Sequence, residues 1–457
     1  MATERRICHR KVSLTVPTSD RDSEPATLLT PDAPFAVGEV RSGPVVLPPL
    51  ASWRRALVLL WLGQVVSHLG DALFLVGIAY LAREVTGSWS RGGLLVAANF
   101  VPALVLGLFA GAFVDRHDRR RVMIAADLLR ALAVGAIPAL YVTGHLGALA
   151  LAAAVFGLAT GTTIFNPAIK ALLPELVPVD RLTGAVSLFQ ISEYVALVAG
   201  PALAALALPR LGMIHLFSVD AATFIFSAAC LTFIPREARR RMHAVVLPAE
   251  SVAALAPQLL KEVGVGLRSA RSNPVLRVLL VLAALDNLII MGLFHLGTPI
   301  LVRETLHLGV DAYAQALTAF CMGLAVASAA FWLVGRHWPK GTTILIGLAL
   351  DGLTFIPLAF CHTLPQLQLA LFFHAMAIPL IIIPRTLLIQ RTVPGPLHGR
   401  TFALLNMTVF GMTAISAAVI GVLAERVAPQ TLFIVFGSIG ALPGLAGFAS
   451  PALRSTR

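Results

Sequence analysis

The chain has 457 residues, of which 57% are hydrophobic and only 13% are charged, and its net charge at pH 7 is +12. A soluble domain carries about 25% charged residues, because its surface must meet water. The low charge therefore excludes an ordinary soluble domain and favours a chain whose outer surface faces lipid. The bases stand in short clusters between apolar runs, which is typical of cytoplasmic membrane loops and not of a nucleic-acid-binding face.

Residues 1–50 are rich in Pro, Ser, Thr and charge, and they contain no apolar run of signal-peptide length. They are predicted to form a disordered cytoplasmic tail, and no cleaved signal is expected. Twelve later runs approach the roughly 20 apolar residues that a bilayer-spanning helix needs. In chain order, these runs lie at about 57–82, 92–114, 122–143, 146–166, 184–208, 212–234, 275–301, 312–335, 342–361, 365–385, 401–423 and 430–450.

The longest interval between two runs is 235–274, which begins with a basic cluster and then has Leu255, Leu259 and Val263 at helical spacing. Both an amphipathic helix on the membrane surface and a solvated linker fit this pattern. The interval divides the spans into six and six, the plan of transporters built from repeats. We predict an all-α membrane protein with the following parts: six-helix bundles at 51–234 and 275–451, a cytoplasmic central loop at 235–274 and a cytoplasmic tail at 452–457.

The distribution of bases predicts that both termini are cytoplasmic, because cytoplasmic loops carry an excess of Lys and Arg. With the N-terminus inside, the short cytoplasmic loops hold eleven bases: Arg116, Arg119, Arg120, Arg121, Lys170, Arg181, Arg336, Lys340, Arg385, Arg391 and Arg400. The external loops hold five, namely Arg83, Arg91, Arg210, Arg303 and Arg426. The strong use of Ala, Leu, Arg, Gly and Pro is typical of GC-rich bacteria, so a bacterial inner or plasma membrane is the expected location.

Several classes of chemistry find no support in the sequence. The cysteines Cys8, Cys230, Cys321 and Cys361 form no C-x-x-C pair, and three of them lie in apolar runs, where they are expected to be small buried hydrophobes. The chain has no H-E-x-x-H, G-x-S-x-G or Walker-type motif. Neither an enzyme nor an ATP-driven pump is therefore expected, and no cofactor or metal.

A motif stands between the second and third predicted spans: Gly111-Ala-Phe-Val-Asp115-Arg116-His-Asp118-Arg119-Arg120. It resembles the signature loop of the major facilitator superfamily. Gly111 would allow close helix approach, Asp115 would accept from donors at a helix N-terminus, and the arginines would pair with acids or lipid phosphates. Asp118 replaces a glycine that is frequent in this loop.

Other stretches are similar to the drug:proton antiporter branch of this superfamily, which includes macrolide and enterobactin exporters. Examples are Asn166-Pro-Ala-Ile-Lys170 and Val219-Asp220-Ala221. The antiporter motif of helix five is kept only in diluted form, as Gly200-Pro201 between alanines. The resemblance implies the superfamily fold and a transport role, with helices 1, 4, 7 and 10 lining a central cavity, helices 2, 5, 8 and 11 flanking it, and helices 3, 6, 9 and 12 at the periphery.

Ionisable groups inside spans are costly, so each one needs a structural or functional reason. The implied cavity helices make Asp71, Glu193 and Asp286 the candidates for proton coupling, although each would equally serve as a buried polar anchor. Asp127 and Arg130 lie three residues apart on one helix face and are expected to form a structural charge cluster near the signature loop. Asp220 and Asp351 are given scaffold roles.

Polar side chains predicted to face the cavity are Gln64, His68, Gln190, Asn287 and His374. Asn99, Asn166 and Asn406 are further polar groups of the spans, and Phe165, Phe189 and Phe294 offer stacking surfaces, although they would equally face lipid or other helices. His68 lies one turn before Asp71 and would either tune that carboxyl or act as a core histidine.

Together these features predict a secondary transporter that exports an amphipathic small molecule by proton antiport, works as a monomer, and has the substrate, protons and lipids as its partners. The alternatives left open are a lysophospholipid flippase or an uptake symporter with the same fold, and a non-transporting receptor or scaffold.

Overall fold

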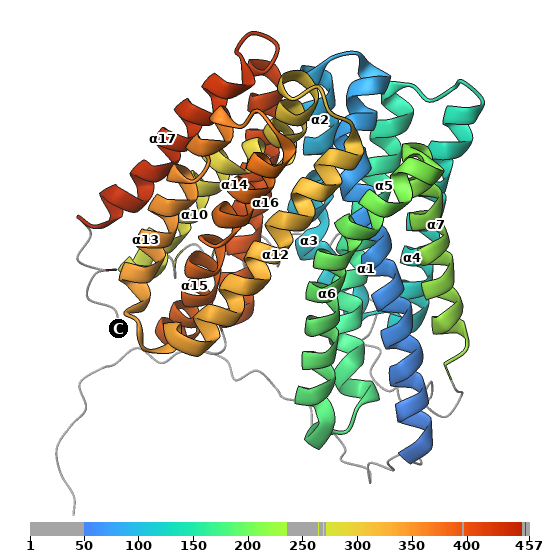
Figure 1. The fold of residues 1–457 in the computed structure, drawn as a ribbon. Helices are drawn as coiled ribbons and strands as arrows, with labels where there is room; N and C mark the ends of the chain where they lie inside the picture. The colour runs from blue at the N-terminus through green and yellow to red at the C-terminus, as the bar shows by residue number, and fades with distance from the viewer. Residues whose placement is uncertain are drawn as a thin grey trace, which may run out of the picture. The chain divides into compact units, whose positions relative to one another are not determined.

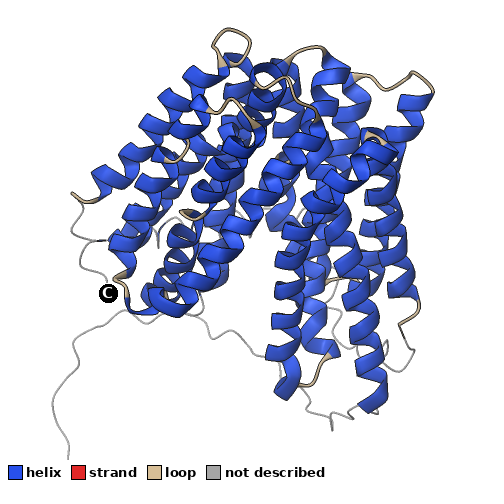
Figure 2. Cartoon of the chain, viewed as in Figure 1, coloured by secondary structure: helices blue, strands red, loops and turns tan. Residues whose placement is uncertain are grey.

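The computed structural model describes residues 50–234, 264, 268, 271–394, 397–449 and 453. These residues belong to one compact unit of helices, and the part of the chain just defined contains no strand (Figure 2). The predicted tail 1–50, apart from Leu50, lies outside the described residues. So do most of the predicted loop 235–274, with its amphipathic stripe, and the tail 452–457 apart from Leu453.

Within the described chain, twelve helical spans are long and apolar enough to cross a membrane, which confirms the predicted all-α membrane fold. The first six are formed by α1 (Leu50–Thr86), α2 (Trp89–Ala98) with α3 (Val101–Asp115), α4 (Arg119–Val142), α5 (Ala148–Leu176), α6 (Val179–Leu211) and α7 (Met213–Thr232) (Figure 1). The last six are formed by α10 (Pro274–Gly292) with η1 (Leu293–Gly297), α11 (Thr298–Ile300) and η2 (Leu301–Thr305), then α12 (Val310–Val334), α13 (Lys340–Leu353) with η4 (Ile356–Phe360), α14 (Leu364–Ala375) with α15 (Ile378–Thr392), α16 (His398–Leu423) and α17 (Pro429–Gly447).

Several spans are interrupted near prolines, a feature that the apolar runs did not predict. The second span breaks between α2 and α3, just before Pro102, and the tenth breaks between α14 and α15, just before Pro379. The seventh passes through two π-helical turns that flank Pro299. Proline lacks an N–H and clashes with the preceding turn, so it removes a bond from the helical hydrogen-bond ladder and favours a break at these positions.

The two sets of six helices repeat one packing pattern. In the N-terminal half, α1 packs against α6 and α7, α4 against α5 and α7, and α3 against α5. In the C-terminal half, the corresponding partners are α10 with α16 and α17, α13 with α15 and α17, and α12 with α14. The halves meet where α2 and α3 contact α16 and where α6 contacts α12. This is the arrangement of two six-helix bundles built from repeats.

Small residues permit the closest approaches. A Cβ at Gly200 of α6 would lie 2.2 Å from the Cβ of Ala72 in α1, so the glycine kept from the antiporter motif allows these helices to touch. A Cβ at Gly93 of α2 would lie 2.8 Å from the carbonyl oxygen of Ala417 in α16, which belongs to the other half. Glycine is therefore required at one contact inside the N-terminal half and at one contact between the halves.

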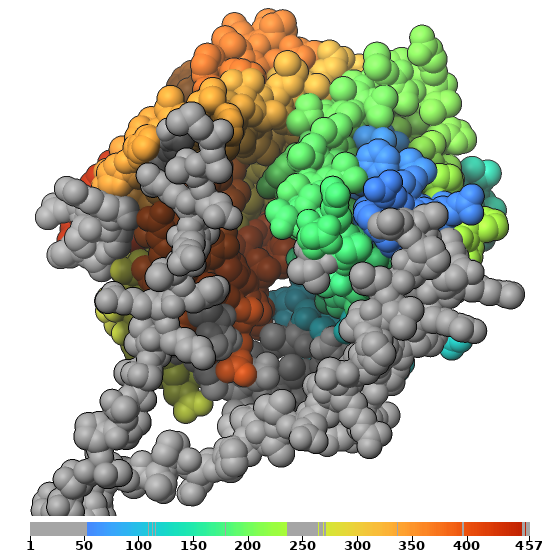
Figure 3. Space-filling view, turned by 90° about the horizontal axis from the view of Figure 1, so that it is seen from below, coloured from blue at the N-terminus to red at the C-terminus, as the bar shows by residue number. Residues whose placement is uncertain are grey.

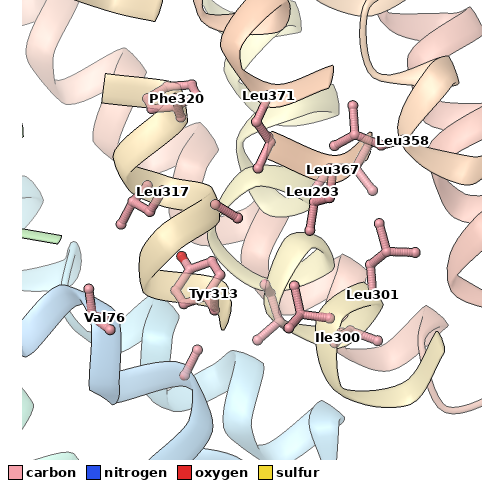
Figure 4. Packing of buried hydrophobic residues seen from close by; sticks show 14 of the residues in the cluster. Val76, Leu293, Ile300, Leu301, Tyr313, Leu317, Phe320, Leu358, Leu367 and Leu371 are labelled. Carbon is pink, nitrogen blue, oxygen red and sulfur yellow. The ribbon is translucent and has the colours of Figure 1, made fainter. Parts of the chain in front are cut away.

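The two ends of the helices pack differently. We call the end with the loops before α4, α6, α13 and α16 the basic end, and the other the opposite end. Toward the opposite end, one buried apolar cluster joins both halves, and Figure 4 shows Val76 of α1 near Tyr313 and Leu317 of α12. Toward the basic end, the buried clusters are separate, one around Met123 in the N-terminal half and one around Leu345 in the C-terminal half. The core that unites the halves therefore lies toward the opposite end.

Candidate functional site

A cavity of about 610 Å³ lies between the two halves. Seen from the basic end, the surface is hollowed between N-terminal helices, in blue and green, and C-terminal helices, in orange and brown (Figure 3). A pocket for an organic small molecule usually measures about 300–1,000 Å³, so this cavity is of the right size. It is lined by Asp71, Phe74, Leu75, Ile78, Val96, Asn99, Phe100, Ala103, Gly107, Leu158, Ala159, Thr162, Thr163, Asn166, Lys170, His295, Ala403, Asn406, Met407 and Phe410.

Asp71 of α1 is the one carboxylate among the described residues that line the cavity. Its side chain keeps 37% of its accessible surface, and its Oδ2 lies 3.8 Å from Nδ1 of His68, one turn earlier on α1. His68 does not line the cavity itself. Asp71 therefore presents its carboxyl group to the cavity, and the imidazole of His68 lies next to it on α1.

One wall of the cavity is aromatic. Phe100 lies in the break between α2 and α3. Its ring centre is 6.2 Å from that of Phe410 of α16, in a stacked arrangement, and 5.4 Å from that of His295 of η1. Such ring faces suit a flat apolar group. The interruptions near Pro102 and Pro299 place Phe100 and His295, which is why regular helices did not predict them as cavity residues.

Amide and hydroxyl groups make up much of the remaining polar lining. Asn99, Asn166 and Asn406 come from three different spans, and Thr162 and Thr163 come from α5. An apolar pocket with a few polar groups of this kind binds molecules that are amphipathic, because each polar group orients one substituent. The three asparagines were among the polar groups singled out in the sequence, whereas Lys170 had been assigned to a basic loop.

Two other polar residues predicted for the cavity act within helix contacts instead. Gln64 is buried, and its Nε2 donates to Ser227 Oγ of α7 at 3.4 Å. Asn287 of α10 donates to the carbonyl of Ala283 and accepts from Thr413 of α16 at 3.4 Å. Neither lines the cavity. In this conformation both are interhelical anchors, which hold α1 to α7 and α10 to α16.

Glu193 lies in the middle of α6 and is exposed, and Gln190 Nε2 donates to its carboxylate at 3.1 Å. Neither residue is among those lining the cavity. Helical periodicity places Glu193 on the same face as Leu197 and Ala204, which pack in the cluster that joins the halves. Glu193 thus occupies the continuation of that face toward the basic end, and its role in proton coupling stays a prediction.

Asp127 and Arg130 of α4 form the predicted ion pair in the interior of the N-terminal half. The Arg130 guanidinium also lies 4.3 Å from the ring centre of Phe165 and 4.4 Å from that of Phe224. Cation–π contacts on both sides compensate part of the lost hydration of the charge. Phe165 is thereby used for packing and is not a cavity wall.

The signature loop makes specific contacts at the basic end. Arg119 pairs with Glu175 of α5 and donates to the carbonyl of Ala171, and Arg120 Nε donates to the carbonyl of Leu231 at 2.6 Å. Asp118 caps α4, since its side chain accepts from the Arg121 N–H at 3.1 Å. The acid that departs from the family pattern therefore has a structural use.

The predicted role of Gly111 in the signature loop is not met, and the predicted role of Asp115 falls on a side chain outside the described residues. An ideal Cβ at Gly111 would meet no atom within 4 Å, so the predicted close helix approach is absent in this conformation. The side chain of Asp115 lies outside the described part of the structure. Arg116 stands at the end of α3, where it follows the helix as its C-cap residue.

In the C-terminal half, Asp286 of α10, Asp351 of α13 and His374 of α14 are buried away from the cavity. His374 Nε2 lies 3.9 Å from Asp351 Oδ1, and His374 Nδ1 shares a hydrogen bond of 2.9 Å with Thr354 Oγ1. The structure therefore brings together His374, which was predicted for the cavity, and Asp351, which was given a scaffold role, and His374 does not line the cavity.

At the opposite end, five residues form a contact between the halves that we call the latch. The Ser88 hydroxyl donates to Glu425 Oε1 at 2.6 Å, the Ser90 N–H donates to the same atom at 3.1 Å, and Trp89 Nε1 donates to Glu304 Oε1 at 2.9 Å. The hydrogen bond from Ser88 lowers the pKa of Glu425 below its usual value. A residue of the C-terminal half thus caps helix α2 of the N-terminal half.

A family model described as Major Facilitator Superfamily matches residues 60–410, which is more than half of the chain. The chain belongs to the major facilitator superfamily. It is accordingly a multi-pass membrane transporter of small molecules, as the signature loop indicated.

The chain is similar to several bacterial transporters of this superfamily. It is 28% identical over 412 residues to the uncharacterized MFS-type transporter YfiS of Bacillus subtilis, which covers 87% of this chain and 93% of the relative. It is 25% identical to macrolide efflux protein A of Streptococcus pyogenes (85% and 94% covered) and 25% identical to the multidrug efflux pump Tap of Mycolicibacterium fortuitum (88% and 97% covered).

Solved structures support the fold at much lower sequence identity. A mutant of the peptide transporter POT in complex with alafosfalin superposes with a TM-score of 0.70 at 14% identity, covering 88% of this chain and 95% of that one. The nucleoside transporter NupG superposes with a TM-score of 0.68 at 12% identity, covering 88% and 100%. The two-bundle architecture is therefore shared with proteins of very low sequence identity.

Proposed function

We propose that this transporter exports amphipathic small molecules that carry a cationic amine, in exchange for protons. The observation that carries the proposal is the cavity between the halves, in which Asp71 faces an aromatic wall and a set of amides. An amine would pair with Asp71, an apolar ring system would stack on Phe100 and Phe410, and oxygen substituents would bind the asparagines. The names of two relatives, a macrolide exporter and a multidrug pump, agree with this class of substrate.

Exchange follows from competition for one carboxylate. A proton and an ammonium group cannot both satisfy Asp71, so binding of the amine releases the proton to the side to which the cavity is open. When the cavity faces the other side, a proton returns to Asp71 and the amine leaves. His68, 3.8 Å from Asp71, is placed to hold or pass this proton.

The conformation described is closed by the apolar cluster and the latch at the opposite end. With the predicted orientation, the basic end faces the cytosol, and this is the state that loads substrate from inside the cell. Export then requires the opposite end to open. Because both halves of the chain contribute side chains to the cavity, we propose that one copy suffices for transport.

The test is transport of ethidium in proteoliposomes with an imposed pH gradient. We expect Asp71→Asn to reduce gradient-driven accumulation by about tenfold or more, the scale of a typical coupling free energy. Asp71→Glu should retain part of the activity, and Asp180→Asn, which alters an exposed acid of α6 at the basic end, should behave as wild type. Glu193→Gln and Asp286→Asn are measured beside them as the other predicted coupling residues.

Four outcomes would contradict the proposal. If Asp71→Asn, Glu193→Gln and Asp286→Asn all keep wild-type proton coupling, the assignment of the acids is wrong. Movement of a fluorescent lysophospholipid without transport of ethidium would indicate a flippase. Accumulation of ethidium in the reverse direction would indicate an uptake symporter. A protein that binds ethidium but never moves it would be a receptor or scaffold.

A further inference from the structure

The C-terminal half contains a chain of polar side chains that the cavity does not use. It consists of Asp286 of α10, Asp351 of α13, His374 of α14 and Thr354, which follows α13. The Asp286 and Asp351 carboxyls interact with each other, His374 Nε2 lies 3.9 Å from Asp351 Oδ1, and Thr354 Oγ1 is 2.9 Å from His374 Nδ1. The exposed fractions of Asp286, Asp351 and His374 are only 7%, 3% and 1%.

A hydrogen bond between the carboxyls of Asp286 and Asp351 requires a proton. A carboxylate is only an acceptor, so two carboxylates cannot form a hydrogen bond to each other unless one of them is protonated. Two negative charges in contact would also repel strongly where water does not screen them. Asp286 Oδ1 has no hydrogen-bond partner within the described protein, so one oxygen of the pair is left to accept or carry a proton.

The charged groups around the pair do not remove this need. Arg385 of α15 faces Asp286 and can balance one negative charge of the two. His374 is the one further ionisable group near Asp351 on the packed helices that the structure describes. Helix α17, which packs on α10 and α13, has no ionisable side chain, and those of α16 are confined to its first turn. One guanidinium therefore faces two carboxyls.

This arrangement is also suited to a proton rather than to a metal cation. A sodium ion needs several oxygen ligands around it, whereas here a guanidinium faces one of the two carboxyls and adds a positive charge to the site. The part of the chain that the structure describes contains no group of three or more His, Cys, Asp or Glu side chains that could hold a metal ion. The chain Asp286–Asp351–His374–Thr354 instead alternates groups that can donate and accept protons.

We propose that Asp286 and Asp351, positioned by His374 and Thr354, form a proton-binding site in the C-terminal half that is separate from the substrate cavity. This inference rests on the proposed function and adds to it a second place where a proton is held. The site reaches the cavity through two helices. His295, which lines the cavity, stands nine residues after Asp286 on the same span, and Thr413 of α16, the hydrogen-bond partner of Asn287, stands three residues after Phe410.

The path between the two sites has a local feature that favours movement. The π-helical turn η1 separates Asp286 from the end of its span and holds His295. π-helical turns are irregular insertions that change register more readily than α-helical turns, and they are frequent at functional sites. A change in the charge of the Asp286–Asp351 pair would alter how α10 packs on α13, and η1 would transmit that change to the aromatic wall.

The first experiment observes the proton directly. Infrared difference spectra of the purified wild-type protein at neutral pH should contain the C=O stretching band of a buried protonated carboxyl. We expect the band to disappear in Asp351→Asn and in Asp286→Asn, and to remain in Asp71→Asn and in the control Asp180→Asn. A wild-type spectrum without this band, or a band unchanged in both variants, would overturn the proposal whether or not the protein transports anything.

The second experiment separates coupling from folding and binding. In proteoliposomes, ethidium counterflow without a pH gradient should stay within about twofold of wild type in Asp351→Asn, which shows that the variant folds and moves substrate. Gradient-driven accumulation should fall by about tenfold or more. His374→Gln should shift the pH dependence of accumulation while keeping counterflow, as a positioning residue would.

The outcomes distinguish this inference from the proposed function. If Asp71→Asn abolishes coupling while Asp351→Asn and Asp286→Asn both keep it, the cavity alone carries the proton and the second site is refuted. If accumulation requires sodium and fails in choline medium, the site binds a metal cation and the proposal is equally refuted. If Asp351→Asn loses counterflow, Asp351→Glu separates a folding defect from a loss of the carboxyl. Asp351→Glu must restore counterflow and coupling together if the carboxyl acts as proposed.

Discussion

Arg130 carries a full charge in the interior of the N-terminal half, with only 3% of its surface exposed. Its guanidinium is held by the carboxylate of Asp127 and by the faces of Phe165 and Phe224. A buried ion pair adds little net stability compared with apolar groups, but removal of one partner leaves the other charge without compensation. The two residues should therefore behave as a unit when they are substituted.

We predict that Arg130→Met destabilises the folded protein by about 3–5 kcal/mol, the usual cost of leaving a buried charge unpaired. The double variant Arg130→Met with Asp127→Leu should recover a large part of this loss, because no charge remains. Thermal unfolding in detergent, measured for both single variants and the double variant, tests the coupling. Additive effects of the two substitutions would show that the pair is not an energetic unit.

At the scale of elements, the latch is a contact in which the C-terminal half caps the first turn of helix α2 of the N-terminal half. The first N–H groups of α2 need acceptors, and Ser88 and Glu425 provide them from opposite halves. The lowered pKa of Glu425 means that the folded state favours its charged form, mainly through the hydrogen bond from Ser88. A group of this kind contributes stability above its unfolded pKa and loses that contribution as the pH falls through the lowered value.

The latch should accordingly be closed at neutral and mildly acidic pH, and should weaken only below pH 4.5, the ordinary pKa of a glutamate. We predict that Glu425→Ala increases the population that is open at the opposite end and removes its dependence on low pH. Spin labels at His145→Cys and His362→Cys, in a background without the native cysteines, report the distance between the halves. Glu84→Ala, a surface glutamate that bonds Tyr141 within the N-terminal half, is the control and should change nothing. A latch that opens between pH 8 and pH 6 would contradict this account.

At the scale of the whole molecule, the packing of the two halves fits the two-state transport cycle that we propose. They share one apolar cluster toward the opposite end and have separate clusters toward the basic end, so rotation about the central contacts can exchange the closed and open ends. The direction of transport then depends on which end faces the cytosol. The bases near the signature loop predict that this is the basic end.

Labelling of single cysteines in intact cells tests this orientation. Arg121→Cys and Arg181→Cys replace exposed arginines of the basic end, and a membrane-impermeant maleimide should reach them only after permeabilisation. His145→Cys and His362→Cys at the opposite end should react in intact cells. The reverse pattern would place the described open end outside the cell and would remove the basis for export.

The sequence by itself determined the number and order of the spans, because the cost of exposing polar groups to lipid imposes long apolar runs on any chain that crosses it. It also identified the superfamily and the Asp127–Arg130 pair, which depends only on helical spacing within one helix. The tertiary structure alone decided which polar residues face the cavity. Gln64 and Asn287 are used between helices, His374 joins Asp351, and His295 and Phe100 enter the cavity at breaks in their spans. Faces toward lipid, cavity and neighbouring helix are all largely apolar in a transporter, so only long-range packing distinguishes them.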